Sequence, residues 1–189
     1  MQTITPVQTN WFVVTGAPCS GKTSLLRKLH KKGYSWHPEV AREYIEKALE
    51  NGQTLHEIRA DEGIFQKGLI DTKAKLEHTL NVKEIHFLDR AMPDSITYYR
   101  VAGLDHREVL PHCHKFRYRR IYLLDVLPYK LDHARTENTE TVKYIDQWLE
   151  EDYKSLGYGV LRIPVMSLSK RRDFILADIK NQLPDHSNS

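Results

Sequence analysis

The sequence predicts an α/β fold in which helices cover both faces of a parallel sheet. Five apolar runs of strand length alternate with helical segments, the order that right-handed βαβ crossovers produce. The first run, Trp11–Thr15, is followed directly by the stretch GAPCSGKT at 16–23, which opens a helical segment. An apolar run that ends at a glycine is typical of a buried parallel strand.

Length and composition predict one domain. A chain of 189 residues is long enough for one sizeable core and too short for two full domains. Hydrophobic residues make up 40 % and charged residues 28 % of the chain, which excludes the disordered and membrane classes. We expect an N-terminal arm at 1–10, the domain at 11–183 and a flexible tail at 184–189.

Charge and cysteine content say little about partners but favour a compartment. The formal net charge of +3 does not discriminate between partner classes. The N-terminal residues show no basic stretch followed by an apolar core, and no apolar run is long enough to span a membrane. Two cysteines, Cys19 and Cys113, do not make a disulfide framework. We expect a cytoplasmic protein.

The other elements follow from apolar spacing and capping signals. Further strands are expected at 35–39, 84–89, 120–126 and 160–165. Helices are expected at 22–32, 40–50, 54–80, 94–102, 105–110, 139–156 and 167–183. Thr54 and Glu57 have the spacing of a capping box, while Gly63 and Gly68 are expected to kink or break the same helix. Pro111 is expected to stop the helix at 105–110.

The stretch at 16–23 has the spacing of a phosphate-binding loop, with two glycines five apart followed by lysine and a hydroxyl residue. Its backbone N–H groups point at phosphate oxygens, Lys22 reaches the β and γ phosphates, and Thr23 holds Mg²⁺. We therefore expect ATP or GTP as the cofactor, with Mg²⁺. We interpret Cys19 as a small filler of the loop rather than a nucleophile. The expected nucleotide-binding residues are Gly16, Ala17, Pro18, Cys19, Ser20, Gly21, Lys22, Thr23 and Ser24.

Asp89 ends the strand expected at 84–89. A strand-end carboxylate beside a phosphate loop reaches Mg²⁺, usually through water, so Thr23 and Asp89 form the expected metal site. Asp89 and Arg90 together lie at the carboxyl edge of the sheet, where open α/β folds bind ligands. The alternative is that Asp89 only caps the next turn.

Glu39 ends the strand expected at 35–39 and lies three residues before Arg42. At the same edge of the sheet, Glu39 would accept a proton from a phosphoryl acceptor, and Arg42 would bind an anionic or polar group. We expect Glu39, Arg42 and Arg90 to bind the acceptor, with 41–80 as a helical acceptor-side region. The alternative is that Glu39 is an ordinary glutamate at a helix N-terminus.

A charged segment at 127–138, LPYKLDHARTEN, lacks apolar periodicity. We expect it to be a lid that closes on the site, with Asp132 and Arg135 in it. An arginine in this position stabilises the charge on a transferred phosphoryl group. The alternative is a polar surface loop.

Two other patterns are interpreted as structural. The HCH stretch at 112–114 has no matching ligand pair at zinc-finger spacing, so we expect an ordinary connection there. The stretch KFRYRR at 115–120 interleaves basic and aromatic residues, but no second basic cluster extends it. We expect a solvated lead-in to the next strand and no strong nucleic-acid signal.

Five stretches follow one another along the chain: TGAPCSGKTSLL, PEVAREYIE, FLDRAMPDSITYYRVAG, IYLLDVLPYKLDHARTEN and DYKSLGYGVLRIPVMSLSKRRDFIL. Together they resemble the AAA-type phosphate-loop ATPase/kinase family. That family includes the ribosylnicotinamide kinase domain of the trifunctional NAD-metabolism regulator and the N-terminal domain of the TRPL translocation defect protein. The resemblance covers nearly all of residues 11–180.

The resemblance implies a three-layer P-loop NTPase fold of the nucleoside and nucleotide kinase type, with a five-stranded parallel sheet. It implies nucleotide phosphate at 16–23 and magnesium at Thr23 and Asp89. It also implies an acceptor side around Glu39, Arg42 and Arg90, with a lid at 127–138. It implies no particular acceptor.

Two functions follow from these expectations. The first is a small-molecule, nucleoside-like kinase that moves the γ-phosphate to an acceptor hydroxyl, with Lys22, Glu39, Asp89 and Arg135 as catalytic residues. The alternative is a nucleotide-dependent regulatory protein with slow ATPase or GTPase activity and a protein partner. The guanine signature NKxD is missing, and DRAM stands where small GTPases have DxxG. A nucleic-acid enzyme is a distant third hypothesis.

Overall fold

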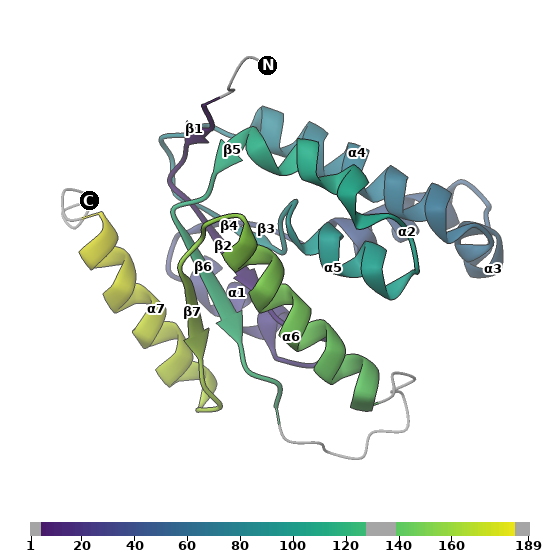
Figure 1. The fold of residues 1–189 in the computed structure, drawn as a ribbon. Coiled ribbons are helices and arrows are strands. Elements are labelled where there is room, and N and C mark those ends of the chain that lie inside the picture. The colour runs from purple at the N-terminus through teal and green to yellow at the C-terminus, as the bar shows by residue number, and fades with distance from the viewer. Residues whose placement is uncertain (1–4, 128–138, 184–189) are drawn as a thin grey trace.

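Five parallel strands form the central sheet, in the order β3, β4, β2, β6 and β7. The computed structural model describes residues 5–127 and 139–183. Figure 1 shows β2 in the middle of the sheet. This sheet, with helices on both of its faces, confirms the expected three-layer fold. The strands are β2 (Trp11–Thr15), β3 (Ser35–His37), β4 (His86–Asp89), β6 (Arg120–Leu124) and β7 (Val160–Ile163).

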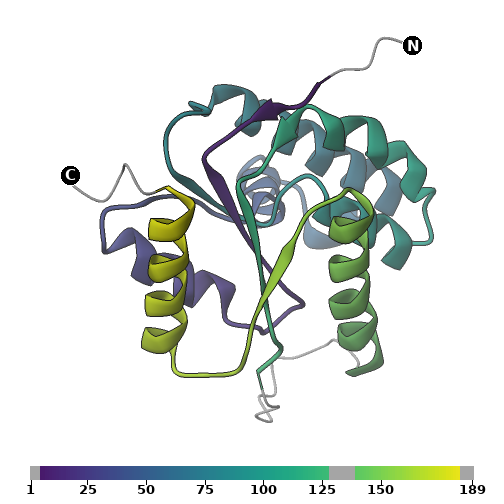
Figure 2. The same ribbon diagram turned by 60° about the vertical axis from the view of Figure 1, so that its left-hand side comes forward.

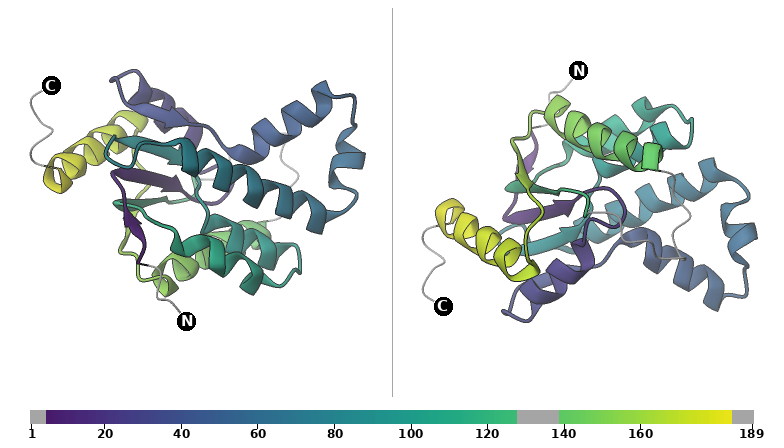
Figure 3. Two further views of the ribbon diagram at one scale, coloured as in Figure 1. Left: turned by 90° about the horizontal axis from the view of Figure 1, so that it is seen from above. Right: turned by 90° about the horizontal axis from the view of Figure 1, so that it is seen from below.

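Helices cover both faces of this sheet. One face carries α1 (Lys22–His30) and α7 (Leu168–Gln182), and the other carries α5 (Asp94–Val101) and α6 (Thr139–Ser155), as Figure 2 shows. The helices α2 (Val40–Glu50), α3 (Leu55–Arg59) and α4 (Glu62–Thr79) are consecutive. In Figure 3, α2, α3 and the first half of α4 project to one side of the sheet.

The alternation of side chains along β2 builds two cores. Phe12 and Val14 face the core shared with α1 and α7, while Trp11 and Val13 face the core on the side of α6. All four side chains are fully buried. A central parallel strand that is covered on both faces needs apolar residues on both of its faces. This is why residues 11–14 (WFVV) show no alternation of apolar and polar side chains.

The helices α2 to α4 have a small core of their own, made by Val40, Ala48, Ile58, Phe65 and Leu69. This core explains how a three-helix region stays folded while it projects from the sheet. At the outer end of this region, the side chains of Thr54 and Asp61 accept hydrogen bonds from backbone N–H groups at the starts of α3 and α4.

The expected kink at Gly63 or Gly68 was wrong. The helix breaks earlier, where Asp61 caps α4 by accepting a hydrogen bond from the backbone N–H of Ile64 at 2.9 Å. Both glycines lie inside α4. A Cβ at Gly68 would lie 2.7 Å from the Tyr44 hydroxyl oxygen, so this glycine allows α2 to approach α4 closely. The capping box of Thr54 and Glu57 at the start of α3 is confirmed.

The expected stop at Pro111 was also wrong. A 3₁₀ helix, η1 (His106–His114), continues through Pro111. Val109 and Cys113 are its buried residues. They hold η1 against α4 and α5, so tertiary packing maintains the turn although proline removes one donor.

The stretch at 115–120 is not a solvated lead-in. It contains β5 (Phe116–Arg117), which pairs in parallel with β1 (Val7–Gln8) inside the segment expected to be an arm. Tyr118 is buried, and the Arg117 guanidinium stacks on the Tyr158 ring at 3.8 Å. The aromatic and basic side chains of this stretch are therefore used within the protein.

Two expectations fall on other parts of the chain. The expected lid, apart from Leu127, and the expected tail lie outside the described residues, and with them Asp132 and Arg135. Among the described residues, no helix is both long enough and apolar enough to cross a bilayer.

A buried carboxyl on α4 makes stability depend on pH. Glu77 is 4 % exposed and accepts a hydrogen bond from the Tyr118 hydroxyl at 2.7 Å. Burial is the main cause that raises the pKa of Glu77 from 4.5 to about 7, against the smaller opposing effects of that hydrogen bond and of Lys73. Between these values the folded protein binds more protons than the unfolded chain, so stability falls as pH rises through this window.

We predict that Glu77→Gln removes this pH dependence, because glutamine keeps the acceptor for Tyr118 and carries no charge. We compare the free energy of unfolding of the variant with that of the wild type at each pH. The difference, variant minus wild type, should be about 1–3 kcal/mol larger at pH 8 than at pH 5. Denaturant unfolding at both pH values measures this, with Glu50→Gln on the exposed end of α2 as the control. An equal difference between variant and wild type at both pH values would contradict it.

Candidate functional site

The phosphate loop connects β2 to α1, and its glycines are required by its shape. Gly16 has φ +145°, and a Cβ there would lie 2.7 Å from the backbone oxygen of Leu124. Gly21 has φ +89° and precedes the first residue of α1. A side chain at either position would be strained, so both positions of the motif have a geometric reason.

Lys22 is buried against the loop that it belongs to. Its Nζ donates to the carbonyl oxygens of Gly16 at 2.8 Å and Ala17 at 3.1 Å, and to Ser20 Oγ at 3.4 Å. Burial, and then the charge of Arg90, lower the pKa of Lys22 below its usual 10.5. A bound phosphate stabilises the charged ammonium and reverses this effect.

Thr23 and Asp89 meet because β4 pairs with β2. The pairing places Asp89 beside Val14, and Thr23 Oγ1 donates to Asp89 Oδ2 at 3.3 Å. The other oxygen, Asp89 Oδ1, is buried and has no hydrogen-bond partner among the described residues. Burial raises the pKa of this carboxyl, and the charge of Lys22 opposes the rise.

This pair fits Mg²⁺. An unpaired buried carboxylate oxygen next to a hydroxyl provides the hard oxygen ligands that the ion prefers, and the ion usually keeps several waters and takes its other ligands from substrate phosphates. Within residues 5–127 and 139–183, no three His, Cys, Asp or Glu side chains group together as metal ligands. A Mg²⁺ ion held here would therefore take the rest of its coordination from waters and a bound phosphate.

Glu39 and Arg90 form an ion pair at the carboxyl edge of the sheet. Glu39 precedes α2, and its Oε1 accepts from Arg90 Nη1. Arg90 directly follows β4 in a left-handed turn with φ +66°. Its guanidinium lies over the Tyr98 ring, 4.9 Å from the ring centre. The two residues that sequence motifs placed on the acceptor side are thus brought together by the fold.

Sequence reasoning missed the residue that fixes this turn. Asp94 is fully buried. It accepts hydrogen bonds from Thr15 Oγ1 at 2.5 Å, from the Tyr153 hydroxyl at 2.5 Å and from the backbone N–H of Ala91 at 2.9 Å. It therefore ties the end of β2 to α6 and to the turn after β4. The only signal in the sequence is an aspartate five residues after Asp89, which helix capping explains equally well.

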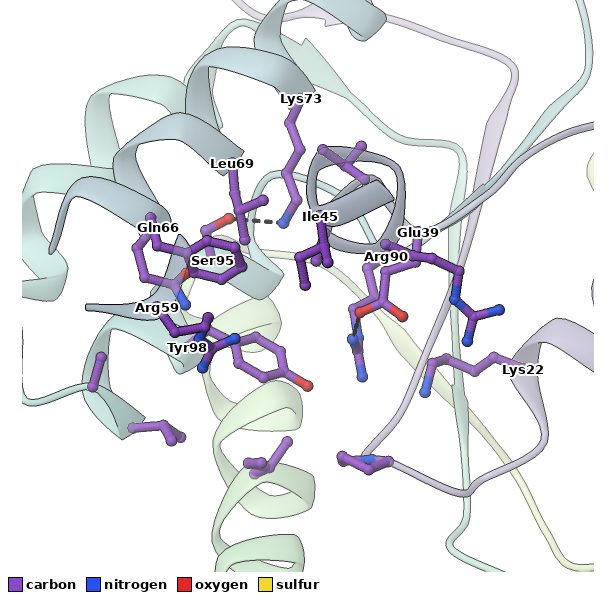
Figure 4. A pocket seen from close by; sticks show the side chains of 18 of the residues that line it. Lys22, Glu39, Ile45, Arg59, Gln66, Leu69, Lys73, Arg90, Ser95 and Tyr98 are labelled. Atoms are coloured by element: carbon purple, nitrogen blue, oxygen red, sulfur yellow. Dashed lines mark hydrogen bonds and ion pairs between the residues drawn. The ribbon is translucent and has the colours of Figure 1, made fainter. Parts of the chain in front are cut away.

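A cavity of about 1140 Å³ joins the phosphate loop to the projecting helices. Figure 4 shows Lys22, Glu39 and Arg90 on one side of it and Gln66, Tyr98 and Arg59 on the other. Its far wall comes from α2, α4 and α5 and includes Ile45, Phe65, Gln66, Leu69, Lys73 and Tyr98. The cavity is large enough for a triphosphate end and a second small molecule together.

Most of the expected site residues border this cavity. They are Pro18, Cys19, Gly21, Lys22, Thr23, Ser24, Glu39, Arg42 and Arg90. Gly16, Ala17 and Ser20 instead hold the Lys22 ammonium, and Asp89 lies behind Thr23. Arg135 lies outside the described residues.

A second residue that sequence reasoning missed, Arg171 of α7, braces the phosphate loop. It is 2 % exposed, and it donates to the backbone oxygens of Ser20 at 2.6 Å, Asp125 at 3.1 Å and Pro164 at 3.1 Å. The guanidinium thus joins the loop to the segments after β6 and β7. All three partners are backbone carbonyl groups.

The family of the chain follows from its match. Residues 11–171 match an AAA domain family. The chain belongs to this AAA domain family. No curated protein matches the chain in sequence. The match confirms the phosphate-loop family that the sequence resembled.

Solved structures of kinases share the fold. A deoxyadenosine kinase from M. mycoides has a TM-score of 0.63 and 15 % identity over 90 % of this chain and 99 % of that chain. The thymidylate kinase from Ehrlichia chaffeensis has a TM-score of 0.65 and 14 % identity, with coverage of 90 % and 97 %. The NadR protein in complex with NR has a TM-score of 0.69 and 17 % identity over 92 % of this chain, which spans 51 % of that chain. At these identities the likeness establishes the fold.

We predict that Arg171→Lys weakens triphosphate binding although Arg171 does not line the cavity. Lysine cannot reach three carbonyl groups at once, so the loop loses its brace and buried acceptors are left unpaired. The affinity for ATP or GTP should fall about 10-fold or more. Titration calorimetry measures this, with Arg172→Lys as the matched control, because Arg172 pairs with its neighbour Asp173. Wild-type affinity in Arg171→Lys would contradict the bracing role.

Proposed function

We propose that the protein is a small-molecule kinase that transfers the γ-phosphate of ATP or GTP to a hydroxyl of a nucleoside-like acceptor. The observation that carries the proposal is the continuous cavity between the phosphate loop and the wall of α2, α4 and α5. A nucleotide switch needs the loop alone. A kinase needs a second compartment beside the γ-phosphate, with a base and cations that face it.

The phosphate loop holds the donor in this proposal. Its backbone N–H groups and the Lys22 ammonium bind phosphate oxygens, and Lys22 leaves the carbonyl groups of the loop to do so. Thr23 and Asp89 would hold Mg²⁺, which when bound neutralises charge on the phosphates. Asp89 Oδ1 supports this role, because it is buried and has no hydrogen-bond partner among the described residues.

Glu39 is the proposed base for the acceptor hydroxyl. Its Oε1 is engaged by Arg90, and its Oε2 has no hydrogen-bond partner among the described residues. The ion pair orients the carboxylate and leaves one oxygen for the proton of the acceptor. Arg90 and Arg42 border the same space, so they would bind the acceptor or the phosphoryl group as charge moves. The lid at 127–138, with Arg135 in it, would complete the site.

Two further observations support the proposal. The likeness in fold to proteins named deoxyadenosine kinase, thymidylate kinase and NadR in complex with NR favours a nucleoside-like acceptor. Cys19 and Cys113 are both free thiols, which favours a reducing cytoplasm as the compartment.

A second candidate is a nucleotide-dependent regulatory protein. Leu49, Leu55 and Ile64 are 42 %, 56 % and 68 % exposed and lie where α2 ends and where α3 and α4 begin. Apolar side chains in that position favour contact with a protein partner. Leu49 and Leu55 also border the cavity, so a partner there would sense its contents.

We predict that Lys22→Ala and Glu39→Gln separate the two functions. Phosphoryl transfer to a panel of nucleosides and ribosylnicotinamide should fall at least about 100-fold in either variant. Glu39→Gln should still bind the triphosphate, since Glu39 does not touch the loop. Lys31→Ala, on the exposed turn after α1, is the control. Product formation followed by mass spectrometry is the measurement.

Two results would contradict this proposal in different ways. Normal turnover of the best acceptor by Glu39→Gln would show that the base is another group. If the wild type binds MgATP or MgGTP and phosphorylates no acceptor, while its set of protein partners changes with the γ-phosphate, the regulatory function is the right one.

A further inference from the structure

The wall of the cavity contains a buried lysine that the proposed transfer step does not use. Lys73 of α4 is 8 % exposed and borders the cavity together with Ser95 of α5. Its Nζ donates to Ser95 Oγ at 2.8 Å and to the backbone oxygen of Ala91 at 3.0 Å. Figure 4 shows the side chain running from α4 toward Ser95, between Leu69 and Ile45.

The charge of Lys73 has no close counter-ion. No carboxylate among the described residues forms an ion pair with it. Asp94 and Glu77 attract it only from a longer distance, and burial outweighs them and lowers its pKa below 10.5. Burial of an ammonium without a partner is costly, so a ligand that accepts a hydrogen bond here would relieve a cost that the fold already carries.

Two donors remain in this corner of the cavity. An ammonium has three N–H groups, and the described residues accept from two of those of Lys73. Ser95 Oγ accepts from Lys73, so its own O–H is left to donate. The two donor atoms lie 2.8 Å apart and both residues border the cavity, so one sp² oxygen with two lone pairs can accept from both.

Of the two hollows that Lys73 borders among the described residues, the larger one has room for such a group. Lys73 also borders a hollow of about 10 Å³ on its other side, which is about the space of one water. Its neighbours in the large cavity, Ile45 and Leu69, offer no polar atom. We infer that the remaining N–H of Lys73 serves a ligand of the large cavity, whose lining contains both Lys73 and Ser95.

We propose that Lys73 and Ser95 select an acceptor that carries a carbonyl or carboxylate oxygen at the end remote from the phosphorylated hydroxyl. An amino group in that position would bring a donor against two donors and leave the ammonium unpaired. The inference rests on the proposed kinase function. It names the chemistry of the acceptor, which the phosphate loop and Glu39 do not determine.

The experiment compares matched acceptors at saturating MgATP. Inosine and adenosine differ by a carbonyl in place of an amino group, and so do uridine and cytidine. The wild type should favour the carbonyl member of at least one pair by about 10-fold or more in kcat/KM. In Lys73→Met this preference should disappear through a higher KM for the carbonyl member. Ser95→Ala, which keeps the lysine, should reduce it in part.

The control is Lys75→Met, an exposed lysine on the same helix, which should keep the wild-type preference. Triphosphate binding by each variant verifies that it is folded. Phosphorylation without a carbonyl preference, or a preference that survives in Lys73→Met, would overturn this inference and leave the kinase function standing. If the wild type phosphorylates neither these four nucleosides nor ribosylnicotinamide, the proposed nucleoside-like function fails and the inference fails with it.

Discussion

The site depends on where β4 ends relative to β2. The parallel pairing places Asp89 beside Val14, and the next residue turns back so that the N–H of Arg90 donates to the Val14 oxygen at 3.1 Å. This turn needs a positive φ at Arg90, a conformation that costs a non-glycine residue of order 1 kcal/mol or more. The Asp94 hydrogen bonds and the ion pair with Glu39 hold it. If this turn shifted, Asp89 and Arg90 would both move relative to the phosphate loop.

The two compartments of the cavity rest on different cores. The phosphate loop is supported by β2, which precedes it, and by Arg171. The far wall of the cavity comes mainly from α2 to α4, which have a separate small core. A change of residue in that wall therefore alters what the cavity holds without disturbing the loop. This division explains how one fold can serve kinases with different acceptors.

The sequence predicted the parts of the fold and site that local pattern determines. The spacing of the phosphate loop has a geometric reason, β2 is a fully buried and almost entirely apolar run, and Asp89 is the last residue of β4. Glu39 was expected to end a strand, but β3 (SWH) already ends at His37, and Glu39 is the N-cap of α2. The failures have a common cause in tertiary contacts. Arg171 bonds an oxygen that is 151 residues away in sequence, and no local pattern announces that contact. Lys73 and Asp94 are ordinary helical residues until packing buries them. Pro111 stays inside η1 because buried neighbours hold it there.

The most direct test of the account is whether one cavity holds donor and acceptor together. Thermal unfolding would be followed with Mg²⁺ and a non-hydrolysable ATP analogue at saturation, and then with nucleosides and ribosylnicotinamide added. A ligand at about one hundred times its dissociation constant adds about 2.7 kcal/mol to stability, so a second ligand is measurable. We predict a further rise in the midpoint temperature with at least one acceptor. This further rise should be lost when a residue in the wall of α2, α4 and α5 is replaced. A rise with the analogue alone, unchanged by every acceptor, would contradict it.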